Sequence, residues 1–217
     1  MNRKHGFTLI ELLIVVAIIA ILAAIAVPNF LEAQVRAKVS AAKSDMRSLA
    51  TALESYRVDN NRYVPTPNYN RATGQQTFTL EERWAYLTTP LSYITSIPRD
   101  PFGDSDVTRS DWRGIPAGSG NVKFATYDYS AFDRAGTYET TTFKQDLVVA
   151  FGYPTSIQWL IASQGPDSQP GLSVADASLG TISGQATGLP YDPTNGTVSA
   201  GDITYVGPGG IVAGGSR

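Results

Sequence analysis

Cysteine is absent from the 217-residue sequence, and histidine occurs once, as His5 near the N-terminus. The absence of cysteine excludes a disulfide framework and a thiolate metal site, and a lone terminal histidine argues against histidine-based catalysis. Charged residues form 17 % of the chain and the net charge is -2, so no strong field attracts nucleic acid or anionic lipid. Hydrophobic residues form 42 % of the chain, which is enough for a folded core.

Motifs typical of enzymes are missing as well. The sequence has no Walker loop and no Gly-x-Ser-x-Gly elbow. Asp100 and Asp104 are candidates for an acid/base pair, but Asp100-Pro101-Phe102-Gly103-Asp104 is more typical of a turn. We therefore expect no catalytic residues.

Charge is nearly absent from the 25 residues Phe7 to Leu31, where Glu11 is the only charged side chain. As a helix rising about 1.5 Å per residue, this stretch would span roughly 37 Å, enough to cross a hydrocarbon core of roughly 30 Å. The stretch predicts a transmembrane helix.

The leader, residues 1–6, is basic through Arg3 and Lys4 and ends in the small residue Gly6. A secretory signal would place its small-residue cleavage site after the apolar run. Here the small residue precedes the run, which suggests a cut that leaves the apolar segment on the mature protein.

Gly6 followed by Phe7-Thr8-Leu9-Ile10-Glu11 and a long apolar helix resembles the class III leader of type IV pilins and of the pseudopilins of type II secretion systems. The resemblance implies cleavage between Gly6 and Phe7 by a prepilin peptidase on the cytoplasmic face, and N-methylation of Phe7. It also implies a helical filament with the apolar helices at its centre, in which Glu11 and Pro28 serve subunit assembly.

The same resemblance implies where the protein lies and what it contacts. The subunit would be stored in the inner membrane among lipid, with its N-terminus cytoplasmic and its head periplasmic, and would later form a periplasmic or cell-surface filament of identical copies. Other partners would be the peptidase, which also methylates, an inner-membrane assembly platform and minor pseudopilins. Basic residues are balanced on the two sides of the apolar stretch, so the orientation rests on the resemblance alone.

Glu11 has two interpretations. Thr8-x-x-Glu11 is a capping box, and near the interface the Glu11 side chain can also reach polar surroundings. Alternatively, cleavage creates a free amine at Phe7, and Glu11 is a suitable partner for that amine on a neighbouring subunit.

The helical pattern continues over residues 32–57, where apolar side chains recur on one face. We expect the lower part of this long helix to form a filament core and the upper part to pack against a head domain. Pro28 should kink or loosen the helix, and the resemblance suggests a segment that melts on assembly.

Residues 58–217 predict a globular α+β head with Gly/Pro/Ser-rich C-terminal loops. Short strands separated by turn signals favour an antiparallel sheet laid against the upper part of the long helix, the arrangement of a pilin fold. A short helix is expected at Thr79 to Leu87, with a capping box from Thr79 to Glu82. Strands are expected at Val122 to Tyr129, Leu147 to Phe151, Gln158 to Ser163 and Ile203 to Val206.

Within the head, the resemblance is closest to the major pseudopilin of type II secretion. That family has a tyrosine-rich helix exit, a proline-framed turn, a Tyr-x-Tyr strand and a Ser-x-Gly-x-Asp turn, and this chain has them in that order. They are Tyr56 to Tyr63, Ile97 to Gly103, Tyr127 to Tyr129 and Ser163 to Asp167. Residues 68–77 and 105–121 resemble insertions, and the tail after Asp167 is longer than is usual in the family.

The family's loop after the Ser-x-Gly-x-Asp turn binds calcium. Calcium takes six to eight oxygen ligands, and the carboxylates of Asp167, Asp192 and Asp202 are eligible here. Asp167 and Asp202 match the family's acidic positions, and Asp192 is added from composition. No basic residue lies between Lys144 and Arg217 to oppose a cation, although ordinary Asx turns explain the same residues.

The sequence thus predicts a structural subunit of a type II secretion pseudopilus that drives protein export. One alternative is a surface type IV pilin for adhesion, motility or DNA uptake. A second is a single-pass membrane-anchored carbohydrate-binding module that stacks sugars on Trp84, Trp112 and Trp159.

Overall fold

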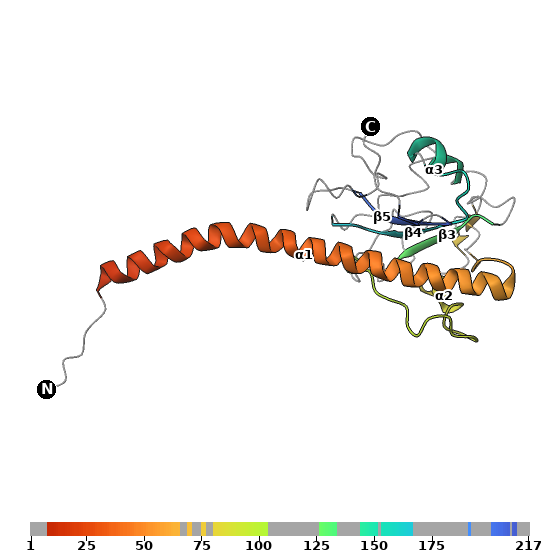
Figure 1. Cartoon of the computed structure of the whole chain (residues 1–217), viewed down its shortest axis with the longest axis horizontal. Coiled ribbons are helices and arrows are strands. Elements are labelled where there is room, and N and C mark those ends of the chain that lie inside the picture. The colour runs from red at the N-terminus through yellow and green to blue at the C-terminus, as the bar shows by residue number, and fades with distance from the viewer. Residues whose placement is uncertain are drawn as a thin grey trace.

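A computed structural model shows a long helix that projects far beyond a compact head (Figure 1). It describes residues 8–65, 69–70, 75–76, 80–103, 126–133, 144–151, 153–166, 191, 201–208 and 210–211.

The long helix, α1, runs without interruption from Leu9 to Asn60 and contains 52 residues, so it is about 78 Å long. Thr8 caps its start, and Asn61 ends it in a left-handed conformation with φ 53°. The predicted single spine is confirmed, but it ends three residues beyond the expected residue 57. The Asn60 amide, which donates to the Tyr56 carbonyl at 2.9 Å, and the tolerance of asparagine for the left-handed region explain the extra residues.

The head contains a four-stranded antiparallel sheet in the order β3-β4-β5-β6. Its strands are β3 (Asp128–Ala131), β4 (Trp159–Ser163), β5 (Ile203–Gly207) and β6 (Gly210–Ile211). The remaining elements are a two-stranded hairpin, β1 (Tyr69–Asn70) with β2 (Gln75–Gln76), and two short helices, α2 (Leu80–Ala85) and α3 (Lys144–Phe151).

The predicted α+β class and three elements are confirmed: the helix near residues 79–87 and the strands near 158–163 and 203–206. The strand expected at Val122 to Tyr129 begins only at Asp128, and residues 122–125 and the Thr79 cap lie outside the described residues.

The strand expected at Leu147 to Phe151 is wrong, because this segment belongs to helix α3. Its adjacent valines suggested a strand, but α3 covers the face of the sheet opposite α1 (Figure 1). Leu147 of α3 is fully buried in the cluster on that face.

Strand β4 is buried on both faces because the head has three layers. Trp159 and Ile161 join the core against α1, and Leu160 and Ala162 join a second cluster with Leu147 of α3. The alternation of side chains across a strand therefore leaves none of the five β4 residues exposed. The sheet therefore lies between α1 and α3.

Candidate functional site

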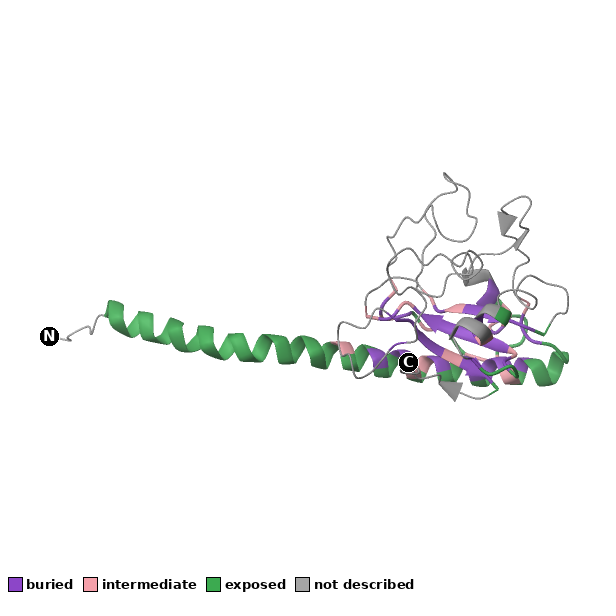
Figure 2. Cartoon of the chain, turned by 90° about the horizontal axis from the view of Figure 1, so that it is seen from above, coloured by how far each residue is buried: buried purple, intermediate pink, exposed green. Residues whose placement is uncertain are grey.

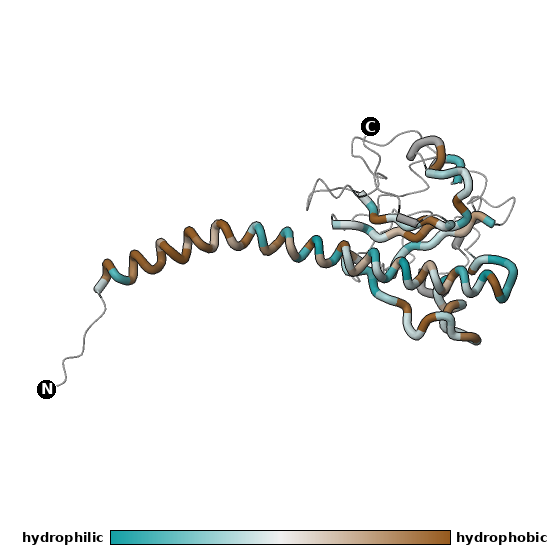
Figure 3. The backbone as a smooth tube through the Cα atoms, viewed as in Figure 1, coloured by the Kyte–Doolittle hydropathy of each residue, from teal (hydrophilic) through white to brown (hydrophobic). Residues whose placement is uncertain are grey.

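The lower part of α1 is an apolar rod, residues 9–31, that touches nothing else in the described chain. Every residue from 8 to 34 is exposed, and the tube in Figure 3 is dominated by apolar colour along this half of the helix. The most hydrophobic 18-residue window has a mean hydropathy of 3.1 and no buried residue, and the helix is long and apolar enough to cross a membrane. Fifteen large apolar side chains between Leu9 and Leu31 have exposed fractions from 46 % to 77 %.

Water is a poor environment for this rod. Burying one large aliphatic side chain is worth about 1.5–3 kcal/mol, so fifteen of them represent tens of kcal/mol. An exposed apolar surface of this size marks a membrane or protein contact. Either lipid or the rods of other copies can cover this apolar surface.

Glu11 and Thr8 form the predicted capping box in the single chain. The backbone N-H and the hydroxyl of Thr8 donate to Oε2 of Glu11 at 2.9 and 2.7 Å, and the Glu11 N-H donates to the Thr8 hydroxyl at 3.3 Å. Both of these hydrogen bonds to the carboxylate use its Oε2 atom. The Glu11 side chain itself is exposed. Gly6 and Phe7, the predicted cleavage site, lie outside the described residues.

Pro28 lies inside α1 without ending it. Proline removes one backbone donor from the helical ladder. The helix nevertheless remains continuous and curves gently along its length, as Figure 1 shows. A local loosening at Pro28 therefore stays a prediction about the assembled state.

Helix α1 first contacts the head at Val35, which is partly buried against the core, whereas residues 8–34 are exposed. From Val39 to Tyr56 one face is buried in the core, and Figure 2 shows this change from exposed to buried along α1.

Side-chain hydrogen bonds add to that packing. The Tyr127 hydroxyl donates to Asp45 at 2.9 Å, and the Trp159 indole N-H donates to Glu54 at 2.8 Å. The Tyr63 hydroxyl lies 3.1 Å from the same Glu54 carboxylate. Sequence analysis missed Asp45 and Glu54, whose charges looked like ordinary surface positions.

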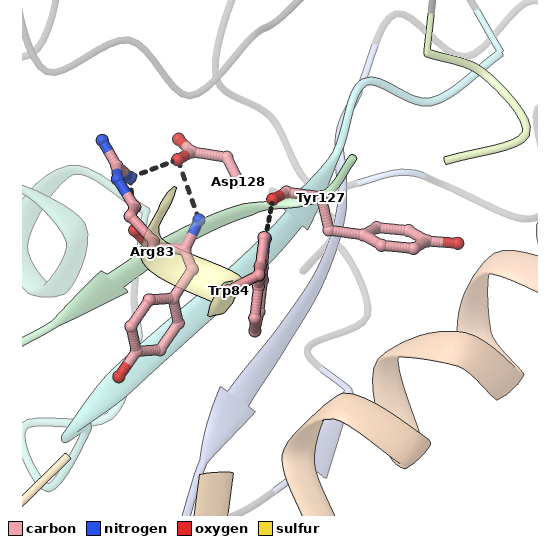
Figure 4. Close-up of polar contacts among 5 residues, drawn as sticks. Arg83, Trp84, Tyr127 and Asp128 are labelled. Carbon is pink, nitrogen blue, oxygen red and sulfur yellow. Dashed lines mark hydrogen bonds and ion pairs between the residues drawn. The ribbon is translucent and has the colours of Figure 1, made fainter. Parts of the chain in front are cut away.

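A buried ion pair fixes α2 on β3 (Figure 4). Arg83 is 4 % exposed and donates to the Asp128 carboxylate at 2.8 Å and to the Tyr129 carbonyl at 2.6 Å. The Trp84 indole N-H donates to the Tyr127 carbonyl at 2.8 Å. Trp84 and Trp159 are core residues, so they form no exposed sugar-stacking face, and Trp112 lies outside the described residues.

Asp100 joins the predicted proline-framed turn to the end of β4. Its carboxylate, 5 % exposed, accepts hydrogen bonds from Phe102 N at 3.0 Å, Ser163 Oγ at 2.8 Å and Gln164 N at 3.1 Å. Burial raises the pKa of the Asp100 carboxyl, and the three donors oppose that rise. Asp100 is thus a structural turn residue, as its sequence context indicated, and Asp104 lies outside the described residues.

Of the predicted calcium ligands, Asp202 alone is described. It is 3 % exposed, and its carbonyl accepts from Tyr191 N at 2.8 Å. Gly165, with φ 70°, packs so closely on Gly201 that an added Cβ would lie 2.3 Å from the Gly201 carbonyl oxygen. Asp167 follows Gly165 by two residues in the sequence, and Asp202 follows Gly201 by one. No cluster of three potential ligands occurs among the described residues, and Asp167 and Asp192 lie outside them.

Comparisons with known proteins match the first half of the chain, up to residue 111. Residues 1–27 match the prokaryotic N-terminal methylation motif, and residues 29–111 match the model for type II secretion system protein G. No solved structure matches the chain.

Three relatives illustrate the similarity. The type II secretion system core protein G of Pectobacterium carotovorum subsp. carotovorum is 37 % identical over 101 residues, which cover 46 % of this chain and 64 % of that protein. The core protein G of Aeromonas hydrophila is 36 % identical over 103 residues, 48 % of this chain and 71 % of that protein. The type IV major pilin protein PilA of Myxococcus xanthus (strain DK1622) is 57 % identical over 66 residues, 30 % of each chain.

The chain spans less than two thirds of the Pectobacterium and Myxococcus proteins. It covers more than two thirds of the Aeromonas protein and carries the protein G domain after a methylation motif. The chain therefore belongs to the type II secretion system protein G family.

Proposed function

We propose that the chain is a structural subunit that polymerises into a type II secretion pseudopilus and drives protein export by filament growth. The observation behind this proposal is the fully exposed apolar rod, which is continuous with a helix fixed in the head. Family membership and the relatives named core protein G support the same function. The buried carboxylate of Asp100 and the partly buried carboxylate of Glu54 make structural hydrogen bonds, which supports a role without catalysis.

Processing precedes assembly in this proposal. A prepilin peptidase cuts between Gly6 and Phe7 and methylates the new amine of Phe7, in keeping with the methylation motif over residues 1–27. In the filament, Glu11 receives the amine of a neighbouring copy, which neutralises both charges and sets the axial register. The carboxylate is accessible for this purpose in the single chain.

Before assembly, the rod lies in the inner membrane among lipid, with its N-terminus in the cytoplasm and its head in the periplasm. After assembly, identical copies replace lipid around the rod. The peptidase, an inner-membrane assembly platform and minor pseudopilins complete the set of partners.

A surface type IV pilin is the second candidate, and the 57 % identity to the Myxococcus pilin favours it over 66 residues. Gold-labelled antibody against the head separates the two. Label confined to the periplasm supports the pseudopilus, whereas long labelled fibres outside normally expressing cells support the pilin.

Two substitutions test the proposal in the producing cell. Gly6→Leu should leave the leader in place and abolish filaments, as seen by mass spectrometry and shearing. Glu11→Ala should still be cut and methylated but should polymerise poorly, and Glu32→Ala, on the same helix above the rod, serves as the matched control. Normal filaments built from uncut Gly6→Leu chains would refute the proposal.

We also propose a calcium ion bound by Asp167, Asp192 and Asp202. The contact of Gly165 with Gly201 and the absence of basic residues over positions 145–216 support it. Calcium that binds the folded head should raise its melting temperature according to its free concentration. A melting temperature that is the same in chelator and in millimolar calcium would exclude this site.

A further inference from the structure

We propose that, in the filament, the loop tip bearing Leu91 of one copy inserts into a groove between α1 and β5 of the next copy. This inference rests on the proposed function that the chain polymerises, and it names the contact between heads.

The groove lies where the outer side of α1 meets β5 and has a volume of about 810 Å³. Val58, at its upper end, is 83 % exposed. The groove follows α1 over twelve residues, from position 47 to position 58, or about 16 Å. It is lined on α1 by Arg47, Ala50, Thr51, Glu54, Ser55 and Val58, and on the sheet by Trp159 and residues 205–208.

The floor of the groove is preformed. Gly207 pairs with Trp159 across β5 and β4, and the indole lies so close that an added Cβ on Gly207 would stand 1.9 Å from it. The indole N-H is fixed by Glu54, and Tyr205 stacks on the same ring at a centroid distance of 5.9 Å. The groove therefore needs little rearrangement to receive a side chain, which favours binding.

Leu91 supplies the complementary projection. Among the described residues of the head, Val58 and Leu91 are the large apolar side chains with more than half of their surface exposed. Leu91 stands in a loop that is closed by hydrogen bonds from Tyr93 N and Ile94 N to the Leu87 carbonyl, at 2.8 and 3.2 Å. This loop presents Leu91 on a rigid base.

The projection and the groove lie on opposite flanks of the head. The loop is held against α1 by Tyr93, which packs on Tyr56 at 5.5 Å and donates to Asp59 at 3.0 Å. Val58 follows Tyr56 by two positions, and at about 100° per residue their side chains point about 200° apart around the helix. In Figure 1 the segment of α2 accordingly lies on the other side of α1 from β5.

A projection on one flank and a groove on the other make a head-to-tail contact. Such contacts are heterologous, and when the rotation between copies does not close a ring they generate a helical filament. The apolar rods alone do not specify this rotation, because they are exposed all round. The Leu91 contact would supply it.

Cysteine cross-linking in assembled filaments tests the contact. The chain has no native cysteine, so the background is clean. A disulfide requires Cβ atoms about 3.5–4.5 Å apart. We expect the double variant Leu91→Cys with Ser55→Cys to give a ladder of covalent oligomers after oxidation, because each copy then links to two neighbours.

The control pair is Leu91→Cys with Ser48→Cys, an exposed serine of α1 outside the groove, and it should give no ladder. Wild-type filaments without a ladder from the Ser55 pair would overturn this contact and leave the proposed function standing. An absence of wild-type filaments would instead refute the proposed function.

A charge substitution gives a second test. Leu91→Asp replaces the apolar projection with a hydrated carboxylate, so the burial of Leu91 in the groove is lost and filament yield should fall roughly tenfold or more. Because Leu91 is exposed in the single chain, the melting temperature of the variant should stay unchanged. Normal filament yield from Leu91→Asp would overturn the contact.

Discussion

Glu54 is the polar link between the spine and the sheet, and its removal should destabilise the head. Its carboxylate accepts hydrogen bonds from the Trp159 indole at 2.8 Å and from the Tyr63 hydroxyl at 3.1 Å. Both donor residues are only 2 % exposed. Glu54→Ala leaves two buried donors without their acceptor, and Glu54→Gln keeps one neutral acceptor oxygen.

The magnitude follows from the two orphaned donors. A buried donor without a partner costs about 1–3 kcal/mol. Glu54 also lines the groove, where water can reach part of the vacated space, so the sum should lie below the maximum. We expect Glu54→Ala to lose about 2–4 kcal/mol of unfolding free energy, or about 4–16 °C in melting temperature for a chain of this size.

The assay is thermal unfolding of the full chain in detergent micelles, followed by near-ultraviolet circular dichroism. Glu32→Ala is the matched control, because it breaks an exposed 3.2 Å pair with Arg36 that should contribute less than about 1 kcal/mol. Burial first, and then Glu54, raise the pKa of Tyr63 to about 12, so Glu54→Gln should also lower that pKa. Equal stability of Glu54→Ala and Glu32→Ala would refute this reasoning.

Three further perturbations probe the same head. Gly207→Ala should cost roughly 1–3 kcal/mol by thermal unfolding, because its Cβ would overlap the Trp159 indole. Asp100→Ala removes the acceptor of three hydrogen bonds and should cost roughly 2–4 kcal/mol in the same assay. Alkaline pH should also destabilise the head, since burial raises the pKa values of Tyr63, to about 12, and of Tyr127. This stabilisation is complete below pH 10 and is lost as pH rises through 12, because the unfolded chain releases its phenol protons first, and tyrosinate absorbance should appear together with unfolding.

The features that sequence analysis predicted well depend on local patterns. The rod needs only an uncharged run, and the upper part of α1 shows its buried face through side chains three and four residues apart, from Val39 to Tyr56. Strands β4 and β5 contain dense β-branched and aromatic residues between turn signals. The Thr8-x-x-Glu11 box is likewise contained within four residues.

The features that were missed depend on distant partners. Glu54 meets Trp159 across 105 residues of sequence, and Asp45 meets Tyr127 across 82, so neither acid differs from a solvated helix charge in the sequence. Helix α3 was mistaken for a strand because Val148 and Val149 favour a strand locally, whereas the need to cover the second face of the sheet decides the outcome.

The state of Glu11 in the single chain sets a condition on the proposed assembly. Its carboxylate is held by the Thr8 backbone and hydroxyl at 2.9 and 2.7 Å while the helix surface is open. Packing identical rods around it removes other polar surroundings, and a carboxylate left unpaired there costs several kcal/mol. In the proposed processing, cleavage before Phe7 would create a positive amine on the residue that precedes Thr8 in every copy. The proposed leader cleavage would therefore also supply the positive charge that pairs with Glu11 when the rods pack together. For this reason an uncut chain should fail to polymerise even though its apolar rod is intact.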